Sequence, residues 1–386
     1  MEKETLFILI GFIVYIGCMI IIRMIYTKKK NFNHGFFGGR NLNDVNITVS
    51  MESNSMSCWL IMGLPGGIYA FGTGQVWIVI GLIVGSILNW SLVGIRLRRY
   101  STRVNDALTV QNYLSNRFHD KNKGILVIAT IMMTGFFCVY IIAAYRSGGE
   151  LISDVFGLNY QVSVTIIAGF ILLYSVIRGV FNTEVTDFIQ EALLLICITV
   201  IPILAYVLMK NDFFELLRNT GVVHGVSSYL DITQDSGEKV SIVYIISMLG
   251  WGLGYFGMPY VLVLFMESAS EKELIKSKYI SLLLTAGTLA SAAIVGVIAR
   301  AYLFPEVLEN SKREMVIIHM IKKMFTETYA MPILGGVLLC SLLMVIVAAA
   351  KSQMALTVSN LAENIYKGIF AKKAKHKSIV RAGNLI

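Results

Sequence analysis

Long apolar runs alternate with short polar segments along the whole of this 386-residue chain. The first run, residues 6–26, holds about 20 consecutive mostly apolar residues, which is the length that an α-helix needs to cross a bilayer. The pattern predicts nine spans, at residues 6–26, 45–71, 74–95, 124–145, 161–181, 186–208, 240–265, 276–302 and 331–362. It therefore predicts an all-α polytopic membrane protein.

The composition agrees with that prediction. The chain is 56% hydrophobic and 15% charged, whereas soluble domains carry about 25% charged residues. The formal charge of +9 does not indicate nucleic-acid binding, because the basic residues fall in short clusters between apolar runs. The first run has no small-residue cleavage site, and the basic segment 28–30 follows it, so a retained helix is expected rather than a signal peptide.

The basic clusters also predict the orientation in the membrane. They all fall on one side, which the positive-inside rule makes cytoplasmic, so the N-terminus is expected outside and the C-terminus inside. The clusters occupy residues 28–40, 96–103, 117–123, 272–278 and 367–377. Loops 210–239 and 303–330 are then extracellular, and the segment YRSGGE at 145–150 is expected to be an outer loop.

The residue types that enzymes and metal sites need are not arranged for that chemistry. All five cysteines lie inside apolar segments, with no CxxC pair and no nearby histidine pattern, so neither disulfides nor zinc are expected. The sequence contains no nucleophile–base pair and no phosphate-binding loop. We therefore predict neither an enzyme nor a cofactor.

The second predicted span begins with unusual polarity. Residues 50–67, SMESNSMSCWLIMGLPGG, combine serines, a glutamate and an asparagine with a Gly/Pro-rich end. In lipid, irregular backbone survives only where protein or a water-filled cavity satisfies it, and secondary transporters build their substrate and ion sites from such helices. The alternative is a polar helix entry with a proline kink and no ligand.

The seventh predicted span is interrupted too. Residues 250–259, GWGLGYFGMP, place four glycines and a proline at mid-membrane depth, five spans after the first interruption. Two Gly/Pro-broken helices in corresponding positions of two halves indicate an inverted-repeat transporter. The alternative for this segment is close helix packing through small residues.

Four segments carry a resemblance to a known family: FGGR at 37–40, MSCWLIMGLPG at 56–66, WGLGYFGMP at 251–259 and NLAENIYK at 360–367. With these motifs the chain resembles the sodium:solute symporter family, and within it the bacterial sodium/proline symporters. The resemblance implies a five-plus-five inverted-repeat fold behind an extra N-terminal helix, alternating access, sodium-driven uptake and a bacterial plasma-membrane location.

On that frame the chain is a single transmembrane domain. Residues 6–26 are the extra helix, residues 45–208 the first repeat and residues 240–386 the second repeat. The second repeat then has only three of its five helices, so we expect either a fragment, a truncated gene product or an incomplete chain.

The resemblance also implies a substrate pocket for a proline-sized zwitterion. It requires half-helix N–H groups for the carboxylate, carbonyl groups for the amine and an aromatic wall for the ring. The implied substrate-binding residues come from the two broken spans and the fourth span: Ser57, Trp59, Tyr140, Trp251, Tyr255 and Pro259.

The expected sodium site departs from the family pattern. The sodium-linked aspartate before Met56 is replaced by Ser55, and the hydroxyl pair of the ninth span falls on Ala348 and Ala349. Lys351 stands where the family has a small polar residue, and a family glycine is replaced here by Glu52.

These changes suggest that sodium coupling is lost or altered. We expect Lys351 to occupy the site, either bonded to carbonyl groups near Ser53 and Met56 or paired with Glu52, and to carry a proton in place of sodium. The alternative is that Lys351 extends toward the cytoplasmic surface from a shallower position.

Two further residues match family positions. Asp187 matches an aspartate at the start of the sixth span and is a candidate ion ligand or gate, although an acidic residue at a helix N-terminus is also favoured by the dipole. Arg40 matches a coupling-related arginine beside the broken helix, and its alternative is an ordinary cytoplasmic charge.

Together these features predict a secondary transporter that imports proline or a similar small amino acid, with Na⁺ or H⁺ as the coupling ion. Its expected partners are the substrate and the lipid bilayer. The alternatives are a non-transporting membrane sensor or symporter remnant, and a channel-like facilitator.

Overall fold

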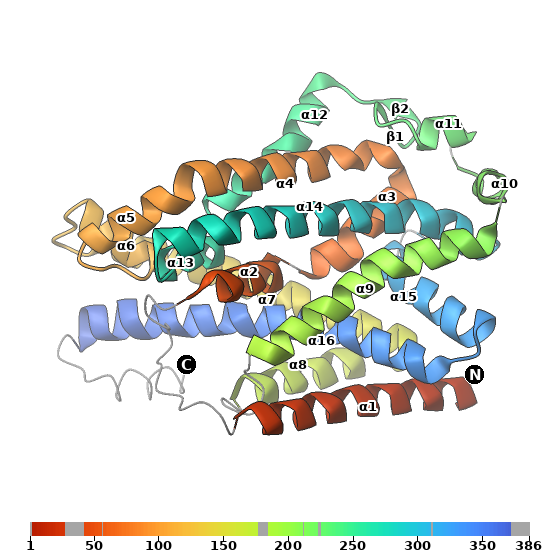
Figure 1. Cartoon of the computed structure of the whole chain (residues 1–386), viewed down its shortest axis with the longest axis horizontal. Coiled ribbons are helices and arrows are strands. Elements are labelled where there is room, and N and C mark those ends of the chain that lie inside the picture. The colour runs from red at the N-terminus through yellow and green to blue at the C-terminus, as the bar shows by residue number, and fades with distance from the viewer. Residues whose placement is uncertain are drawn as a thin grey trace.

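A computed structural model describes residues 2–27, 42–55, 57–176, 184–210, 212–222, 225–309 and 312–371. The long helices run roughly along the long axis of the molecule and lie side by side (Figure 1). They are α1 (Glu2–Thr27), α4 (Val76–Leu88), α7 (Gly124–Phe156), α8 (Tyr160–Val176), α9 (Glu184–Met209), α14 (Glu271–Tyr302) and α16 (Pro332–Asn360).

Shorter elements occupy the two ends of this bundle (Figure 1). One end carries α5 (Ile95–Arg103) and α6 (Val110–Arg117). The other carries α10 (Phe213–Asn219), α11 (Gly225–Tyr229), a hairpin of β1 (Gln234–Asp235) and β2 (Glu238–Lys239), and α15 (Val316–Lys322). Helical turns of other types are η2 (Thr73–Gln75), η3 (Asn89–Gly94), η5 (Arg313–Met315), η6 (Lys323–Thr328) and η7 (Leu361–Phe370).

The predicted spans correspond to helical segments of the structure. Within the described ranges, six helices are long and apolar enough to cross a membrane, and a pair bent by 41° makes a seventh. The second and fifth predicted spans contain shorter apolar helices, Trp59–Phe71 and Tyr160–Leu173. The chain is therefore a multi-pass helical membrane protein, while its division into two inverted repeats stays a prediction.

The expected loop at residues 145–150 is wrong, because α7 continues without a break to Phe156. The glycines of this segment serve helix packing. A Cβ at Gly148 would lie 2.8 Å from Cγ1 of Ile167, and one at Gly149 would lie 3.1 Å from Cα of Val164. Both neighbours belong to α8, so the glycine pair lets the two helices approach closely.

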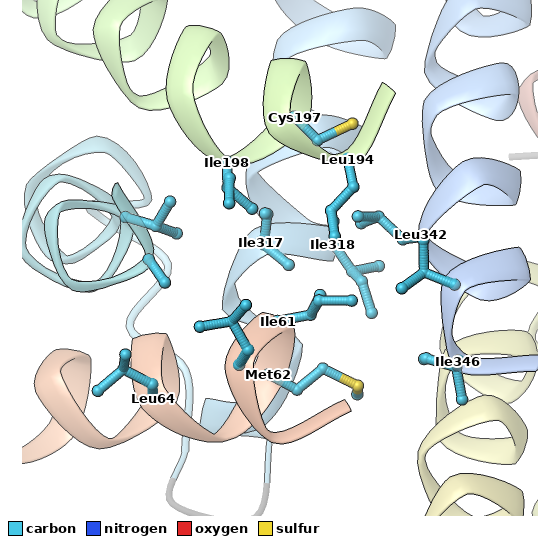
Figure 2. Close-up of a cluster of buried hydrophobic side chains, with 14 of the residues drawn as sticks. Ile61, Met62, Leu64, Leu194, Cys197, Ile198, Ile317, Ile318, Leu342 and Ile346 are labelled. Carbon is cyan, nitrogen blue, oxygen red and sulfur yellow. The ribbon is translucent and has the colours of Figure 1, made fainter. Parts of the chain in front are cut away.

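The first interrupted helix consists of three parts: α2 (Asp44–Ser55), η1 (Trp59–Gly63) and α3 (Leu64–Phe71). Ser57 lies outside the helices, and its carbonyl accepts the N–H groups of Leu60 and Ile61 as the chain re-enters helical structure. Figure 2 shows Ile61 and Met62 of η1 facing the side chains of α15, α9 and α16. The interruption is thus held in place by packing on three other helices.

The second interrupted helix consists of α12 (Ile242–Leu249), η4 (Gly250–Phe256) and α13 (Pro259–Glu267). The end of α12 and the 3₁₀-helix η4 pack against α4 backbone to backbone. A Cβ at Gly81 would lie 2.7 Å from Cα of Leu249 in α12, and one at Gly85 would lie 2.5 Å from Cα of Gly252 in η4. The two interpretations of this motif are therefore compatible, because the glycines both interrupt the helix and allow close packing.

One end of α3 is covered by the loop elements. The Tyr229 hydroxyl donates to the Ile68 carbonyl at 2.9 Å, and the Leu308 N–H donates to the Tyr69 hydroxyl at 2.9 Å. The Arg300 guanidinium lies 4.9 Å from the centre of the Tyr69 ring, within the range of a cation–π interaction. These contacts fix the loops against the first broken helix.

Replacing Tyr229 with phenylalanine is expected to lower the free energy of unfolding by about 1–3 kcal/mol, because the hydroxyl is buried and its bond to Ile68 is lost. Tyr279→Phe is the matched control, since the Tyr279 side chain is 69% exposed. Thermal unfolding in detergent measures both. Equal melting temperatures of the two variants would contradict a stabilising role of the bond.

Candidate functional site

A small cavity lies between the two interrupted helices. Its volume is about 190 Å³, below the 300–1,000 Å³ that is typical of pockets for drug-sized ligands. The residues that line it come from both broken helices and from α4, α7 and α14: Glu52, Ser57, Trp59, Leu60, Leu82, Tyr140, Trp251, Tyr255, Met258, Tyr260, Thr285, Thr288 and Leu289. The cavity therefore suits a small organic ligand.

Aromatic rings form much of its wall. The indole rings of Trp59 and Trp251, one from each broken helix, are stacked with their centres 5.2 Å apart at 26°. Tyr140 of α7 adjoins Ser57, and Tyr255 of η4 is 8% exposed. Such a wall offers a large apolar surface and ring faces that attract cations.

A carboxyl group lies among these rings. Glu52 is 1% exposed, and its Oε1 accepts a hydrogen bond of 2.8 Å from the Thr285 hydroxyl of α14. Thr288 lies one turn further along α14 and also lines the cavity. Polar side chains from α2 and α14 thus meet at one side of the site.

The start of α13 faces the cavity as well. Met258, the residue before this nine-residue helix, and Tyr260 near its first turn both line the site. Pro259 has no N–H, and the N–H groups of Val261 and Leu262 bond to the Met258 carbonyl. It is therefore the positive end of the helix dipole that favours an anionic ligand group here.

Five of the six predicted substrate-binding residues line this one cavity: Ser57, Trp59, Tyr140, Trp251 and Tyr255. Pro259 does not, although its neighbours on both sides do. Sequence reasoning missed the contribution of α14. The signal was available in a stripe of hydroxyl residues at helical spacing along this apolar segment: Ser277, Ser281, Thr285 and Thr288. The substrate-binding role of the cavity-lining residues stays a prediction.

The residues of the expected ion site are only partly described. Helix α2 contacts α16, which carries Ala348, Ala349 and the partly buried Lys351. Met56 and Arg40 lie outside the described residues, as do the side chains of Ser53, Ser55 and Asp187. Glu52 bonds to Thr285, and its expected pairing with Lys351 stays a prediction.

Comparison with solved structures shows which fold this arrangement of helices belongs to. The substrate-bound, outward-open state of a Na⁺-coupled sialic acid symporter superimposes with a TM-score of 0.75, covering 98% of this chain and 79% of that one. The two sequences are 15% identical, so this likeness shows the fold alone.

Sequence comparison identifies the family. The sequence profile of the sodium:solute symporter family matches residues 36–386. A sodium/proline symporter of Staphylococcus aureus is 32% identical over 373 residues, which are 95% of this chain and 70% of that protein. The sodium/proline symporter of S. aureus strain NCTC 8325 is 32% identical over 377 residues, 96% of this chain and 71% of that protein. The chain belongs to the sodium:solute symporter family, and its relatives are transporters rather than enzymes.

Proposed function

We propose that this protein binds proline or a similar small amino acid in the cavity between its two interrupted helices and carries it across a bacterial plasma membrane by alternating access. The observation that supports this proposal is the cavity itself. Two stacked indole rings, three tyrosine rings and a helix N-terminus surround a space of about 190 Å³. The S. aureus relatives are named for proline.

Each part of a small amino acid has a counterpart in the site. The N-terminus of α13 suits the carboxylate, and the Trp59–Trp251 pair provides a flat apolar wall for a ring or short side chain. Hydroxyl side chains that line the same space, among them Ser57 and Thr288, offer hydrogen bonds to the remaining polar ligand atoms.

The proposal is tested by direct binding and by uptake. Radiolabelled L-proline is equilibrated with the purified chain in nanodiscs, and its uptake is measured in phosphatidylethanolamine/phosphatidylglycerol proteoliposomes with an inward gradient of Na⁺ or of H⁺. We expect saturable binding and gradient-driven accumulation. If L-proline fails to compete for the site in a panel of amino acids, proline is not the substrate. Binding without accumulation under either gradient would instead support the non-transporting sensor.

We propose further that Lys351 alters ion coupling. A lysine at membrane depth costs at least about 2.5–3.5 kcal/mol unless it is paired or hydrated, so a functional partner is expected for it. The two alanines at 348 and 349 remove the hydroxyl ligands that the family pattern provides. A fixed ammonium group beside the first broken helix would take the place of a bound cation.

Replacing NaCl with KCl is accordingly expected to change L-proline binding by less than about twofold in the wild-type protein, while Lys351→Ala weakens binding at least about tenfold (about 1.4 kcal/mol). Lys272→Ala is the control, because this exposed lysine lies at the start of α14. Binding that requires sodium and survives Lys351→Ala would show that the coupling ion is sodium and that the lysine has no part in it.

A further inference from the structure

The cavity contains one carboxyl group, that of Glu52, and the family resemblance gives this group no role in substrate binding. Among the described residues that line it, Glu52 is the only charged one. Its carboxyl group is 1% exposed, and the hydrogen bond described for it comes from Thr285, a neutral donor. Burial of a carboxylate is costly unless a positive group compensates it.

The surroundings of Glu52 are those of a cation site. Trp59, Trp251, Tyr140 and Tyr255 line the same cavity, and an organic cation gains energy when it lies within about 6 Å of such ring centres. No lysine or arginine is among the described lining residues. A carboxylate and several ring faces around a small space together select an ammonium group.

We propose that the Glu52 carboxylate binds the ammonium group of the substrate and so restricts this transporter to amine-bearing ligands. The inference rests on the proposed function, because it concerns the same cavity. It moves Glu52 from the ion site, where the sequence pattern placed it, to the substrate. The hydroxyl of Thr285 orients the carboxylate, and the N-terminus of α13 is left to receive the anionic end of a zwitterion.

Three ligands of similar ring size differ in the charges they carry, so their affinities show which charge the site recognises. L-Proline carries both an ammonium and a carboxylate, the pyrrolidinium ion carries only the cation, and tetrahydrofuran-2-carboxylate replaces the proline nitrogen with oxygen and carries only the anion. Isothermal titration with the wild-type chain in nanodiscs is expected to show pyrrolidinium binding, and L-proline binding at least about tenfold tighter than that of the oxygen analogue. Equal affinity for L-proline and its oxygen analogue overturns the inference without any variant.

Glu52→Gln retains the size of the side chain and its capacity to accept a hydrogen bond from Thr285, but removes the charge. We expect it to weaken L-proline binding at least about tenfold, to abolish pyrrolidinium binding and to leave the oxygen analogue within about twofold of the wild type. Thr285→Val removes the hydrogen bond but keeps the charge, and should retain pyrrolidinium binding within a few-fold. Glu267→Gln is the matched control, since this buried glutamate at the end of α13 does not line the cavity.

The outcomes separate this inference from the proposed function. If pyrrolidinium binds through Glu52 but L-proline does not bind, the substrate is a different amine and the proposed function fails while the ammonium site stands. If L-proline binds equally to the wild type and to Glu52→Gln, the ammonium site is refuted and the proposed function stands. If Glu52→Gln removes the pH dependence of uptake and leaves ligand binding unchanged, the carboxyl group carries a proton and does not bind the ammonium group. That result would also refute the inference.

Discussion

Replacing Gly252 with alanine is expected to destabilise the protein by about 3 kcal/mol and to lower its apparent melting temperature by about 5 °C. A Cβ at this position would lie 2.8 Å from the Gly81 carbonyl carbon and 3.1 Å from Cα of Gly85. Both atoms belong to the backbone of α4, so no side chain can rotate away. The second broken helix would have to move off α4, and one wall of the cavity with it.

Gly250→Ala is the matched control, two residues away on the same segment. A Cβ at Gly250 meets nothing within 4 Å, and the residue has φ −59°, which alanine adopts without strain. We expect this variant to keep or slightly raise the melting temperature. Thermal unfolding by intrinsic fluorescence in detergent measures both, and equal destabilisation would show that loss of glycine flexibility, rather than the close contact with α4, governs this segment.

Replacing Trp251 with alanine is expected to weaken L-proline binding at least about tenfold, which corresponds to about 1.4 kcal/mol. The mutation removes one ring of the Trp59–Trp251 stack and opens the wall of the cavity. Trp251 is 49% exposed, so the expected loss comes from the ring face that it presents to the cavity and to Trp59. Trp251→Phe should retain part of the affinity, because an aromatic face remains against Trp59.

Leu253→Ala is the control for this second prediction. Leu253 belongs to the same turn η4, is 69% exposed and does not line the cavity. Its loss should leave L-proline binding within about twofold of the wild type in the same titration. Equal loss in the two variants would indicate that the segment as a whole is perturbed, and unchanged binding in Trp251→Ala would place the substrate elsewhere.

The predicted membrane spans and the expected loop at 145–150 had different outcomes, for a physical reason. The apolar runs located the helices because a bilayer requires about 20 apolar residues per span, a signal that needs no knowledge of neighbours. The loop expected at 145–150 was wrong, because α7 runs without a break through this segment and its two glycines. They are tolerated in α7 because α8 packs against them, which only the tertiary structure reveals.

The sequence by itself determined that this is a multi-pass helical protein with two interrupted spans, and its motifs identified the family. The family resemblance also pointed to six substrate-binding residues, of which five line one cavity. The tertiary structure decided what else meets there. Thr285 and Thr288 lie far along the chain from Glu52, and no sequence period links residues of α14 to those of α2. Only the packing of these helices brings the carboxyl group of Glu52 into the aromatic cavity.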